Sequence, residues 1–307
     1  MSAPVGISAL ILARNEALNI RRALESLFPW CRDIHVVDSN STDCTREIAR
    51  KFTDNVHVHP YIDHSSQMQW ALENLEFASD WVLLVDADFV VSRELQNQIQ
   101  TAVENAPERV AGFFVVHRYV FRGSEIRFGG TKKWWLRLVR RSRTSVDGSE
   151  LVDFRLAVDG ETCKIPAIVY EDNKNEYDID FWIDKHQTFS TRMACEEVLR
   201  RRGTLGWKQA SRLMGNPDQR IVWFKQRWYR LPLYVRPFAY FFYRYALRLG
   251  FLDGWNGFLF HFLQGFWFRL MVDVKMGEYT RQLKAGQITE GDLIELSGGK
   301  RRLLTGI

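Results

Sequence analysis

Two aspartates two positions apart, Asp86 and Asp88, directly follow the apolar run 81–85. Such a run predicts a buried strand, and carboxylates at the carboxyl end of a strand lie where ligands bind in open α/β sheets. A hard divalent cation such as Mg²⁺ or Mn²⁺ prefers oxygen ligands, including those of a phosphate. The pair therefore predicts a metal–diphosphate site. The alternative is a pair of solvated turn or helix-capping acids.

Polar residues follow two further predicted strands. Asp38 and Ser39 come directly after the apolar run 34–37 and open the polar segment that ends at Asp43. An acid in this position can accept hydrogen bonds from a ribose or a base, whereas plain helix capping is the alternative. Arg14, Asn15 and Glu16 follow the first apolar run in the same way. The convergence of three strand ends predicts one shared ligand site.

A basic stretch lies between residues 127 and 143 and contains no acidic residue. Trp134 and Trp135 interrupt it. Such a stretch can hold phosphates or lie on anionic lipid headgroups, and a solvated basic face is the alternative. Its candidate contacts with an acceptor, a phosphate or a membrane are Arg127, Lys132, Lys133 and Arg137.

The elements that must position these residues follow from the hydrophobic pattern. Short apolar runs at 7–12, 34–37, 56–58 and 81–85 alternate with helical patterns at 16–27, 41–52, 65–77 and 93–104. This alternation is the signature of β/α units and a mainly parallel sheet. Residues 110–170 are richer in strand patterns, and a helix is expected over 178–202.

The composition excludes several classes of protein. The chain has 307 residues, 46% of them apolar and 26% charged, which is enough to bury a full-sized core. Its net charge of +5 is a mild basic excess that does not identify a partner. No recognition-helix or RNA-binding pattern supports nucleic-acid binding. The four cysteines are widely spaced and indicate neither a zinc site nor a disulfide framework, and the run 7–12 predicts a strand rather than a signal peptide.

The three strand-end motifs together resemble the family 2 glycosyltransferases, which have a GT-A fold. The matching segments read ARNE, VVDSNSTDCT and WVLLVDADF. The resemblance implies an α/β, Rossmann-like fold with a mainly parallel central sheet. On this basis we expect a GT-A catalytic domain over 1–203, with a nucleotide-sugar half over about 1–105 and an acceptor half over about 106–203. An amphipathic helical region would follow over 204–277 and a polar tail over 278–307.

The resemblance also implies roles for the residues at the strand ends. Asp38 would contact the nucleotide, while Asp86 and Asp88 would hold the metal-bound diphosphate of a nucleotide sugar through Mg²⁺ or Mn²⁺. Phe89 stands where many relatives have a further acid, which leaves the metal ligands unchanged. The residues implied in nucleotide-sugar binding are Arg14, Asn15, Glu16, Asp38, Ser39 and Asp86.

An inverting transferase of this family needs a carboxylate to deprotonate the acceptor hydroxyl. Relatives commonly have a VDEH-like segment at the corresponding place, and this chain has Glu150 to Arg155. Asp153 matches the first acid of that segment, while Phe154 stands where the second would be. The expected base is therefore Asp153, with Glu150 in reserve and an ordinary strand-edge aspartate as the alternative. The QxxRW signature of processive synthases is absent, which favours transfer of a single sugar.

The C-terminal region has a different composition, with 19 aromatic residues between Trp223 and Phe268. On a helix, Arg236, Arg244 and Arg248 would fall within about 120° of arc and form a cationic side opposite an aromatic surface. This pattern is typical of a helix that lies in the headgroup region of a membrane. A buried helical hairpin or an oligomer interface is the alternative.

These observations predict an inverting hexosyltransferase, located peripherally or monotopically on the cytoplasmic face of the inner membrane. It would move one sugar from a nucleotide sugar, by family habit a UDP-sugar, to a lipid-linked glycan or lipopolysaccharide-type acceptor. The segment 251–260 resembles one found in family members of that kind. Two alternatives stay open: transfer to polyprenyl phosphate, and a membrane-attached nucleotide-binding protein without catalysis.

Overall fold

The computed structural model describes residues 6–148, 150–152 and 154–298. Within them, nine strands form one mixed sheet whose main path runs β3-β2-β1-β4-β8-β6-β11-β5, with β7 paired to β6. The first four strands on this path are parallel. They are β3 (Val56–Val58), β2 (Asp33–Asp38), β1 (Ile7–Ala13) and β4 (Trp81–Asp86). The sequence-predicted strands are thus all present.

The parallel register places the candidate residues at one edge of the sheet. Ala13 at the end of β1 is paired with Asp38 on β2, and Leu12 is paired with Asp86 on β4. Carboxyl ends of parallel strands share one edge, so the segments that follow them emerge side by side. The helices between these strands are α1 (Ile20–Leu27), α2 (Thr45–Ala49) and α3 (His64–Asn74).

The remaining strands extend the sheet beyond β4. They are β8 (Lys133–Arg140), β6 (Val110–Phe121), β11 (Glu161–Glu171) and β5 (Phe89–Val91), and β7 (Ser124–Glu125) lies off the path. Strand β8 is antiparallel to both β4 and β6, whereas β11 is parallel to β6. The register with β6 shifts between Leu138 and Leu136, so Arg137 is an extra, bulged residue. Bulges of this kind often redirect a side chain beside a functional site.

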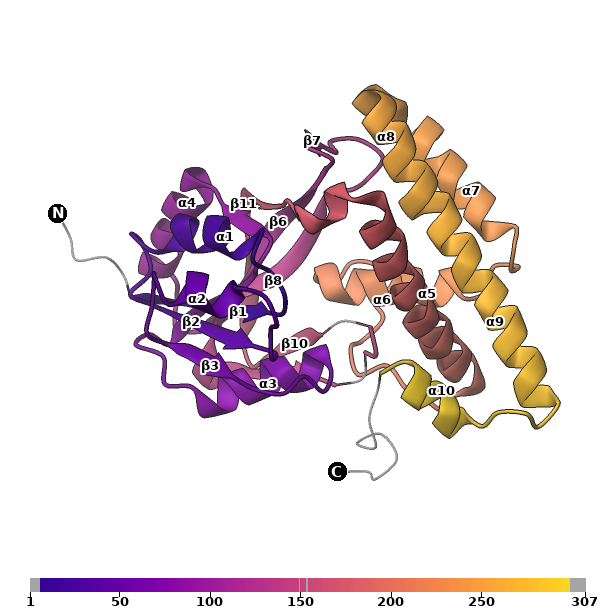
Figure 1. The fold of residues 1–307 in the computed structure, drawn as a ribbon, viewed down its shortest axis with the longest axis horizontal. Coiled ribbons are helices and arrows are strands. Elements are labelled where there is room, and N and C mark those ends of the chain that lie inside the picture. The colour runs from indigo at the N-terminus through magenta and orange to yellow at the C-terminus, as the bar shows by residue number, and fades with distance from the viewer. Residues whose placement is uncertain (1–5, 149, 153, 299–307) are drawn as a thin grey trace.

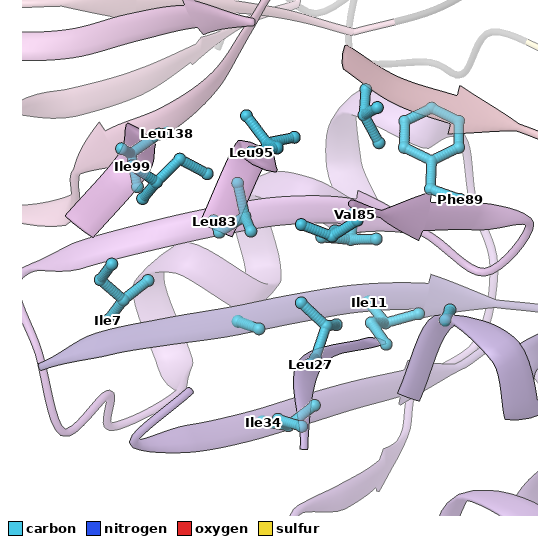
Figure 2. Close-up of a cluster of buried hydrophobic side chains, with 14 of the residues drawn as sticks. Ile7, Ile11, Leu27, Ile34, Leu83, Val85, Phe89, Leu95, Ile99 and Leu138 are labelled. Carbon is cyan, nitrogen blue, oxygen red and sulfur yellow. The ribbon is translucent and has the colours of Figure 1, made fainter. Parts of the chain in front are cut away.

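Helices cover both faces of the sheet. One buried cluster joins β1 and β4 to α1 and to α4 (Arg93–Glu104), as Figure 2 shows for Ile11, Val85, Leu27 and Ile99. The other cluster packs α3 against the opposite face through Met68. Helix α4 begins after Ser92, whose side chain accepts a hydrogen bond from the backbone of Leu95 at 3.2 Å, as an N-cap residue does.

The C-terminal helices form a separate layer beside the sheet (Figure 1). Helix α5 (Ile179–Arg202) packs against α9 (Phe268–Lys284) and α10 (Glu290–Leu296) around a cluster that includes Leu199, Val272 and Leu293. A helical run begins at α8 (Gly254–Phe260), continues through the π-helical segment His261–Trp267 and ends with α9. The other elements are α6 (Pro217–Trp228), α7 (Arg236–Phe242) and a small ribbon of β9 (Thr144–Asp147) and β10 (Arg155–Val158).

The expected cationic side of the C-terminal helix does not form. Arg236, the first residue of α7, is almost fully buried, and it bonds to Asp273 on α9 at 2.8 Å and to Glu197 on α5 at 2.7 Å. Arg244 is also buried, whereas Arg248 is exposed. The prediction that all three face a membrane or an acceptor was wrong for Arg236. Helical spacing identified the arginines, but it could not show that Asp273 and Glu197 lie opposite them.

The aromatic residues around α7 and α8 divide between the interior and the surface. Phe260 is buried, whereas Phe238 is 58% and Trp255 is 71% exposed. No described helix is long and apolar enough to cross a membrane. The region is therefore a packed helical layer with an aromatic outer surface. We call this surface the aromatic face, and its members are Leu231, Tyr234, Val235, Phe238, Phe242, Tyr243, Leu247, Leu249, Phe251, Leu252, Trp255 and Phe262.

Candidate active site

The loops after β1 and β2 are joined by hydrogen bonds that fix one side of the candidate site. The backbone N–H of Asn15 donates to Ser41 Oγ at 2.9 Å, and its side-chain oxygen accepts from the N–H of Thr42 at 2.8 Å. Asn15 has a φ of 55° and Asn40 one of 57°, a region that asparagine tolerates better than most residues. Both asparagines therefore allow the two loops to turn sharply at the strand ends.

Asp38 lies at the centre of this edge and is completely buried. One carboxylate oxygen accepts from the backbone N–H of Ser41 at 2.9 Å and lies 3.7 Å from Arg46 Nε. The other, Oδ2, is buried and has no hydrogen-bond partner among the described residues. A buried carboxylate oxygen without a donor is costly, so this atom is suited to accept a hydrogen bond from a bound ligand.

The neighbours of Asp38 that the sequence indicated have different environments. Ser39 is buried, and its hydroxyl accepts from Gln67 Nε2 at 3.1 Å. Arg14 is exposed, with its guanidinium 6.0 Å from the ring of Tyr61. Ser39 thus helps to support the floor of the site, while Arg14 stays available at its rim.

Asp86 and Asp88 have different partners. Asp86 is partly exposed, and its Oδ2 accepts from Arg137 Nη2 at 2.9 Å. The other terminal nitrogen of Arg137, Nη1, is buried and has no partner among the described residues. The bulge in β8 therefore places a guanidinium beside the first aspartate, with one donor unused.

Asp88 is buried, and its Oδ2 accepts from Asn173 Nδ2 at 3.0 Å. Its backbone oxygen accepts from the N–H of Asp172 at 3.0 Å, so the two segments are fixed together. Burial and then the nearby carboxylate of Glu171 raise the pKa of Asp88 to about 8. The site thus gathers acidic groups that resist ionisation by themselves and that a bound cation would help to ionise.

Glu16 and Glu171 contribute to this concentration of acids. Glu16 accepts from Asn19 Nδ2 at 2.7 Å, and burial followed by Asp88 raises its pKa to about 7. Glu171 contacts His117 Nε2 at 2.6 Å, and burial followed by Glu176 raises its pKa to about 8. Both shifts have the same cause, since acids held close together in a partly dry site resist ionisation.

Several residues of this site were not assigned a role from the sequence. Asn19 and Asn173 share a hydrogen bond of 3.0 Å, and Lys185 on α5 pairs with Glu176 at 2.5 Å. The segment Tyr170 to Lys174 did resemble a motif of the family, but its role stayed open. The asparagines could not have been identified, because they are 154 positions apart in the sequence and meet only in the fold.

The two candidate bases cannot both be evaluated. Asp153 lies outside the described residues. Glu150 is buried and bonds to Lys225 at 2.8 Å and to Arg155 at 3.0 Å. Burial favours the neutral acid, but Lys225, Arg155 and Arg200 outweigh it and lower the pKa of Glu150 to about 2. A carboxylate so strongly stabilised by three cations is a weak base, so the reserve role given to Glu150 is not supported.

The described residues contain no group of three or more acidic, histidine or cysteine side chains placed to hold a metal ion by themselves. Asp86 and Asp88 nevertheless supply the donor set that a magnesium-like ion uses when phosphate oxygens complete its coordination. The excess of carboxylates, which raises three pKa values, fits such an ion. The residues present are thus compatible with a metal that binds together with a diphosphate.

The basic stretch is divided by the fold. Arg137 is buried beside Asp86, whereas Arg127, Lys132 and Lys133 are exposed. The loop that carries Arg127 is held by the C-terminal layer, because Asp253 accepts from the backbone N–H of Arg127 at 3.1 Å and of Phe128 at 2.9 Å. Figure 1 shows the loop after β7 extending to α8. The basic stretch thus runs from the site to the C-terminal helices.

Comparisons with known proteins agree with this arrangement. Residues 8–154 match the family described as Glycosyl transferase family 2. An uncharacterised glycosyltransferase of Rickettsia conorii is 40% identical over 94 residues, which cover 31% of this chain and 33% of that protein. The lipopolysaccharide core biosynthesis glycosyltransferase LpsC of Rhizobium meliloti is 27% identical over 164 residues, which cover 50% of this chain and 58% of LpsC.

A likeness to solved structures is partial. The crystal structure of glucosyl-3-phosphoglycerate synthase from Mycobacterium tuberculosis in complex with Mg²⁺ and uridine diphosphate is 16% identical, with a TM-score of 0.40. It covers 67% of this chain and 82% of the synthase.

Residues 8–154 are thus similar to family 2 glycosyltransferases, and the predicted α/β, GT-A fold class is confirmed. The chain spans only about a third of the length of the Rickettsia relatives that it matches.

Proposed function

We propose that this protein transfers a single sugar, with inversion, from a nucleotide sugar to a lipid-linked glycan or lipopolysaccharide-type acceptor at a membrane surface. The donor part of this proposal rests on one observation. Asp38, Asp86 and Asp88 lie at the same edge of the sheet, within the residues that match the family. The likeness to LpsC, a lipopolysaccharide core biosynthesis glycosyltransferase, supports the acceptor part.

The donor would bind across the ends of β1, β2 and β4. The buried Oδ2 of Asp38, which has no partner among the described residues, would accept a hydrogen bond from the nucleoside. Asp86 and Asp88 would hold Mg²⁺ or Mn²⁺, which supplies Lewis-acid stabilisation of the leaving diphosphate. Arg137 Nη1 would donate to a diphosphate oxygen beside Asp86. We favour a UDP-sugar.

The base remains assigned to Asp153 within this proposal. It would take the proton of the acceptor hydroxyl as that oxygen attacks the anomeric carbon. The neighbouring Phe154 packs on Arg137, with 5.1 Å between the guanidinium carbon and the ring centroid. This contact supports the assignment, because Phe154, which follows Asp153 in the sequence, lies beside the guanidinium that pairs with Asp86.

The aromatic face would bring the enzyme to its acceptor by lying on a membrane surface. Its tyrosines and Trp255 are side chains that favour the interface between water and lipid. The exposed Arg248 lies within it, and Arg230 and Lys132 are further exposed cations that could meet anionic headgroups. Exposed apolar surface of this extent requires a partner, and the accompanying cations favour lipid.

The donor assignment can be tested by incubating the full chain with UDP-sugars and GDP-sugars and measuring release of the free nucleotide. We expect slow, Mn²⁺-dependent hydrolysis of one UDP-sugar, with loss of at least a hundredfold in Asp88→Asn. Asp54→Asn, which changes an exposed aspartate, is the matched control. Release of neither nucleotide with metal and phospholipid present would contradict the proposed transferase.

A further inference from the structure

Three cationic side chains converge around one tyrosine where the basic stretch meets the C-terminal helices. The guanidinium carbons of Arg244 and Arg269 lie 5.4 Å and 5.7 Å from the ring centroid of Tyr240. Tyr240, Arg244 and Arg269 are also electrostatic neighbours of Lys133. We call Lys133, Tyr240, Arg244 and Arg269 the Tyr240 cluster. Its members come from β8, α7, the π-helical segment Tyr243–Leu247 and α9.

These cations are not neutralised by acids within the part of the chain that the structure describes. None of Lys133, Arg244 and Arg269 has a carboxylate at ion-pair distance there, in contrast to the buried Arg236. Arg269 Nε is buried and has no hydrogen-bond partner among the described residues. Like charges held together without a counter-charge destabilise a fold, so this arrangement is suited to a bound anion.

The environment of Tyr240 shows the same convergence. Burial by itself would raise the pKa of its hydroxyl, yet Arg244, Arg269 and Lys133 together hold that pKa below its usual value. A phenol that is easier to ionise than normal, although partly buried, indicates a strongly positive local potential. The acid among the electrostatic neighbours of Lys133 is Glu171, which is already in contact with His117.

The cluster is both accessible and rigidly held. Lys133 is exposed, while Tyr240 and Arg269 are half-buried, so a ligand can approach from the side of Lys133. Arg244 Nε donates to the backbone oxygen of Gly129 at 3.0 Å. Gly129 has a φ of 72°, and a Cβ there would collide with the ring of the buried His261. The loop, the π-helical segments and the cluster therefore form one packed unit, and π-helical turns often occur at functional sites.

The position of the cluster relative to the donor site identifies its role. Lys133 and Arg137 lie on the same strand, with Cα atoms about 13 Å apart by the rise of an extended chain. Trp135 lies between them, 4.7 Å from the Arg137 guanidinium and 5.9 Å from Lys133 Nζ. A reacting acceptor atom must approach within about 3.5 Å of the anomeric carbon. An anion at the cluster is thus too far away to be the reacting group.

We propose that the Tyr240 cluster binds a phosphate or diphosphate group that the acceptor carries at a position away from the reacting hydroxyl. The assignment of this anion to the acceptor rests on the proposed function, whereas the anion site itself does not. Trp135 would then lie beside the sugar that connects the anion to the reaction centre, because indole rings are good apolar platforms.

The test measures the binding of inorganic pyrophosphate to the full chain by calorimetry, in EDTA and 0.15 M NaCl. Leaving out divalent metal removes the route by which a diphosphate would bind at Asp86 and Asp88. We expect binding at millimolar or lower concentration, weakened at least fivefold in Lys133→Gln and in Arg269→Gln. Arg281→Gln, which changes an exposed arginine on the same helix as Arg269, is the matched control and should leave binding unchanged.

Three results would overturn the site: no binding of pyrophosphate by the wild-type protein, equal binding by both cluster variants, or an equal loss in Arg281→Gln. Lys133 is exposed on a strand, so its variant remains informative if Arg269→Gln fails to fold. UDP binding with Mn²⁺ is measured on the same proteins. If the wild-type protein binds pyrophosphate but does not bind UDP with Mn²⁺, the donor assignment is contradicted and the anion site is still supported.

A second arm distinguishes the source of the phosphate. Cosedimentation with phosphatidylcholine vesicles containing phosphatidylglycerol is compared between wild type and the cluster variants. A matching loss of vesicle and pyrophosphate binding would support a phosphate borne by a lipid headgroup. Unchanged vesicle binding with weakened pyrophosphate binding would support a phosphate on the glycan acceptor itself.

Discussion

The two sides of the candidate site, which we call the donor side and the acceptor side after the proposed function, gather acids on one side and cations on the other. Under that proposal, this difference would let one site handle two anionic substrates. The donor side gathers the carboxyl groups of Glu16, Asp86, Asp88 and Glu171, and burial followed by neighbouring acids raises the pKa values of Glu16, Asp88 and Glu171. The acceptor side gathers Lys133, Arg244 and Arg269 around Tyr240. Under the two proposals, a diphosphate would approach the first side together with a metal ion, whereas an anion would bind the second side directly.

The two sides are also built differently. Donor-side residues follow parallel strands and owe their positions to the register of the sheet. Acceptor-side cations lie mainly on helices that are held together by buried ion pairs. The helices should therefore be the easier of the two to disrupt, and variants can separate the sides.

The largest effect is expected from Arg236→Met, which would leave Asp273 and Glu197 buried without their shared cation. Removing one partner of a buried ion-pair network costs about 3–5 kcal/mol. Chemical denaturation followed by circular dichroism should show this loss of unfolding free energy. Arg281→Met is the exposed control and should change stability by less than about 0.5 kcal/mol. A stability close to wild type for Arg236→Met would mean that the C-terminal layer is held mainly by apolar packing.

The next effect concerns pH and the donor-side acids. In the folded protein, the pKa of Asp88 is raised to about 8. Between about pH 4 and pH 8, Asp88 therefore keeps a proton in the folded protein that it has released in the unfolded chain. The metal-free protein should therefore lose stability as pH rises through this window and change little above it. Melting temperatures measured from pH 5 to pH 8 should fall, and Asp88→Asn should flatten the slope. A melting temperature that rises over this range would contradict the charge assignment.

An intermediate effect is expected from Arg137→Met. This change removes the ion pair with Asp86 and the unused donor Nη1, and it replaces the cation–π contacts with Trp135 and Phe154 by apolar packing. Loss of a hydrogen bond to a charged group costs about 1.5–3 kcal/mol, so UDP with Mn²⁺ should bind about tenfold or more weakly. Pyrophosphate binding at the Tyr240 cluster should be unchanged. If UDP and pyrophosphate both bound more weakly by the same factor, the donor side and the acceptor side would not be separate sites.

The smallest effect on stability is expected at the aromatic face. Phe238→Ser and Trp255→Ser change side chains that are 58% and 71% exposed, so unfolding free energy should shift by no more than about 0.5 kcal/mol. Cosedimentation with anionic vesicles should nevertheless fall severalfold. Phe224→Ser, at an exposed phenylalanine outside the face, is the control. Vesicle binding that survives both changes would favour a protein partner for the aromatic face.

The donor side could be predicted from the sequence because its signals are local. Buried parallel strands are continuous apolar runs, and the residues that follow them must meet at one edge. The run 81–85 therefore predicted strand β4, and Asp86 and Asp88 directly after it predicted the metal–diphosphate site. The predicted helix over 93–104 even matches α4 at both ends, because Ser92 is a strong N-cap signal.

The acceptor side could not be predicted in the same way because its partners are distant in sequence. Helical spacing placed Arg236 and Arg244 on one side, but it could not show that Arg236 pairs with Asp273 on α9 and that Arg244 is buried against Gly129. The environment of Glu150 likewise depends on Lys225, which is 75 positions away. Buried ion pairs between helices are properties of the packed structure, and the sequence pattern alone made these arginines resemble a membrane-facing surface.

The central claim is that Asp86 and Asp88 bind a nucleoside diphosphate through a metal ion. Calorimetric titration of UDP and of uridine, each with and without Mn²⁺, tests it directly on wild type and Asp88→Asn. We predict that Mn²⁺ strengthens UDP binding at least tenfold in wild type, has no effect on uridine, and has little effect on UDP in Asp88→Asn. UDP binding that is independent of Mn²⁺ and unchanged in Asp88→Asn would contradict the account.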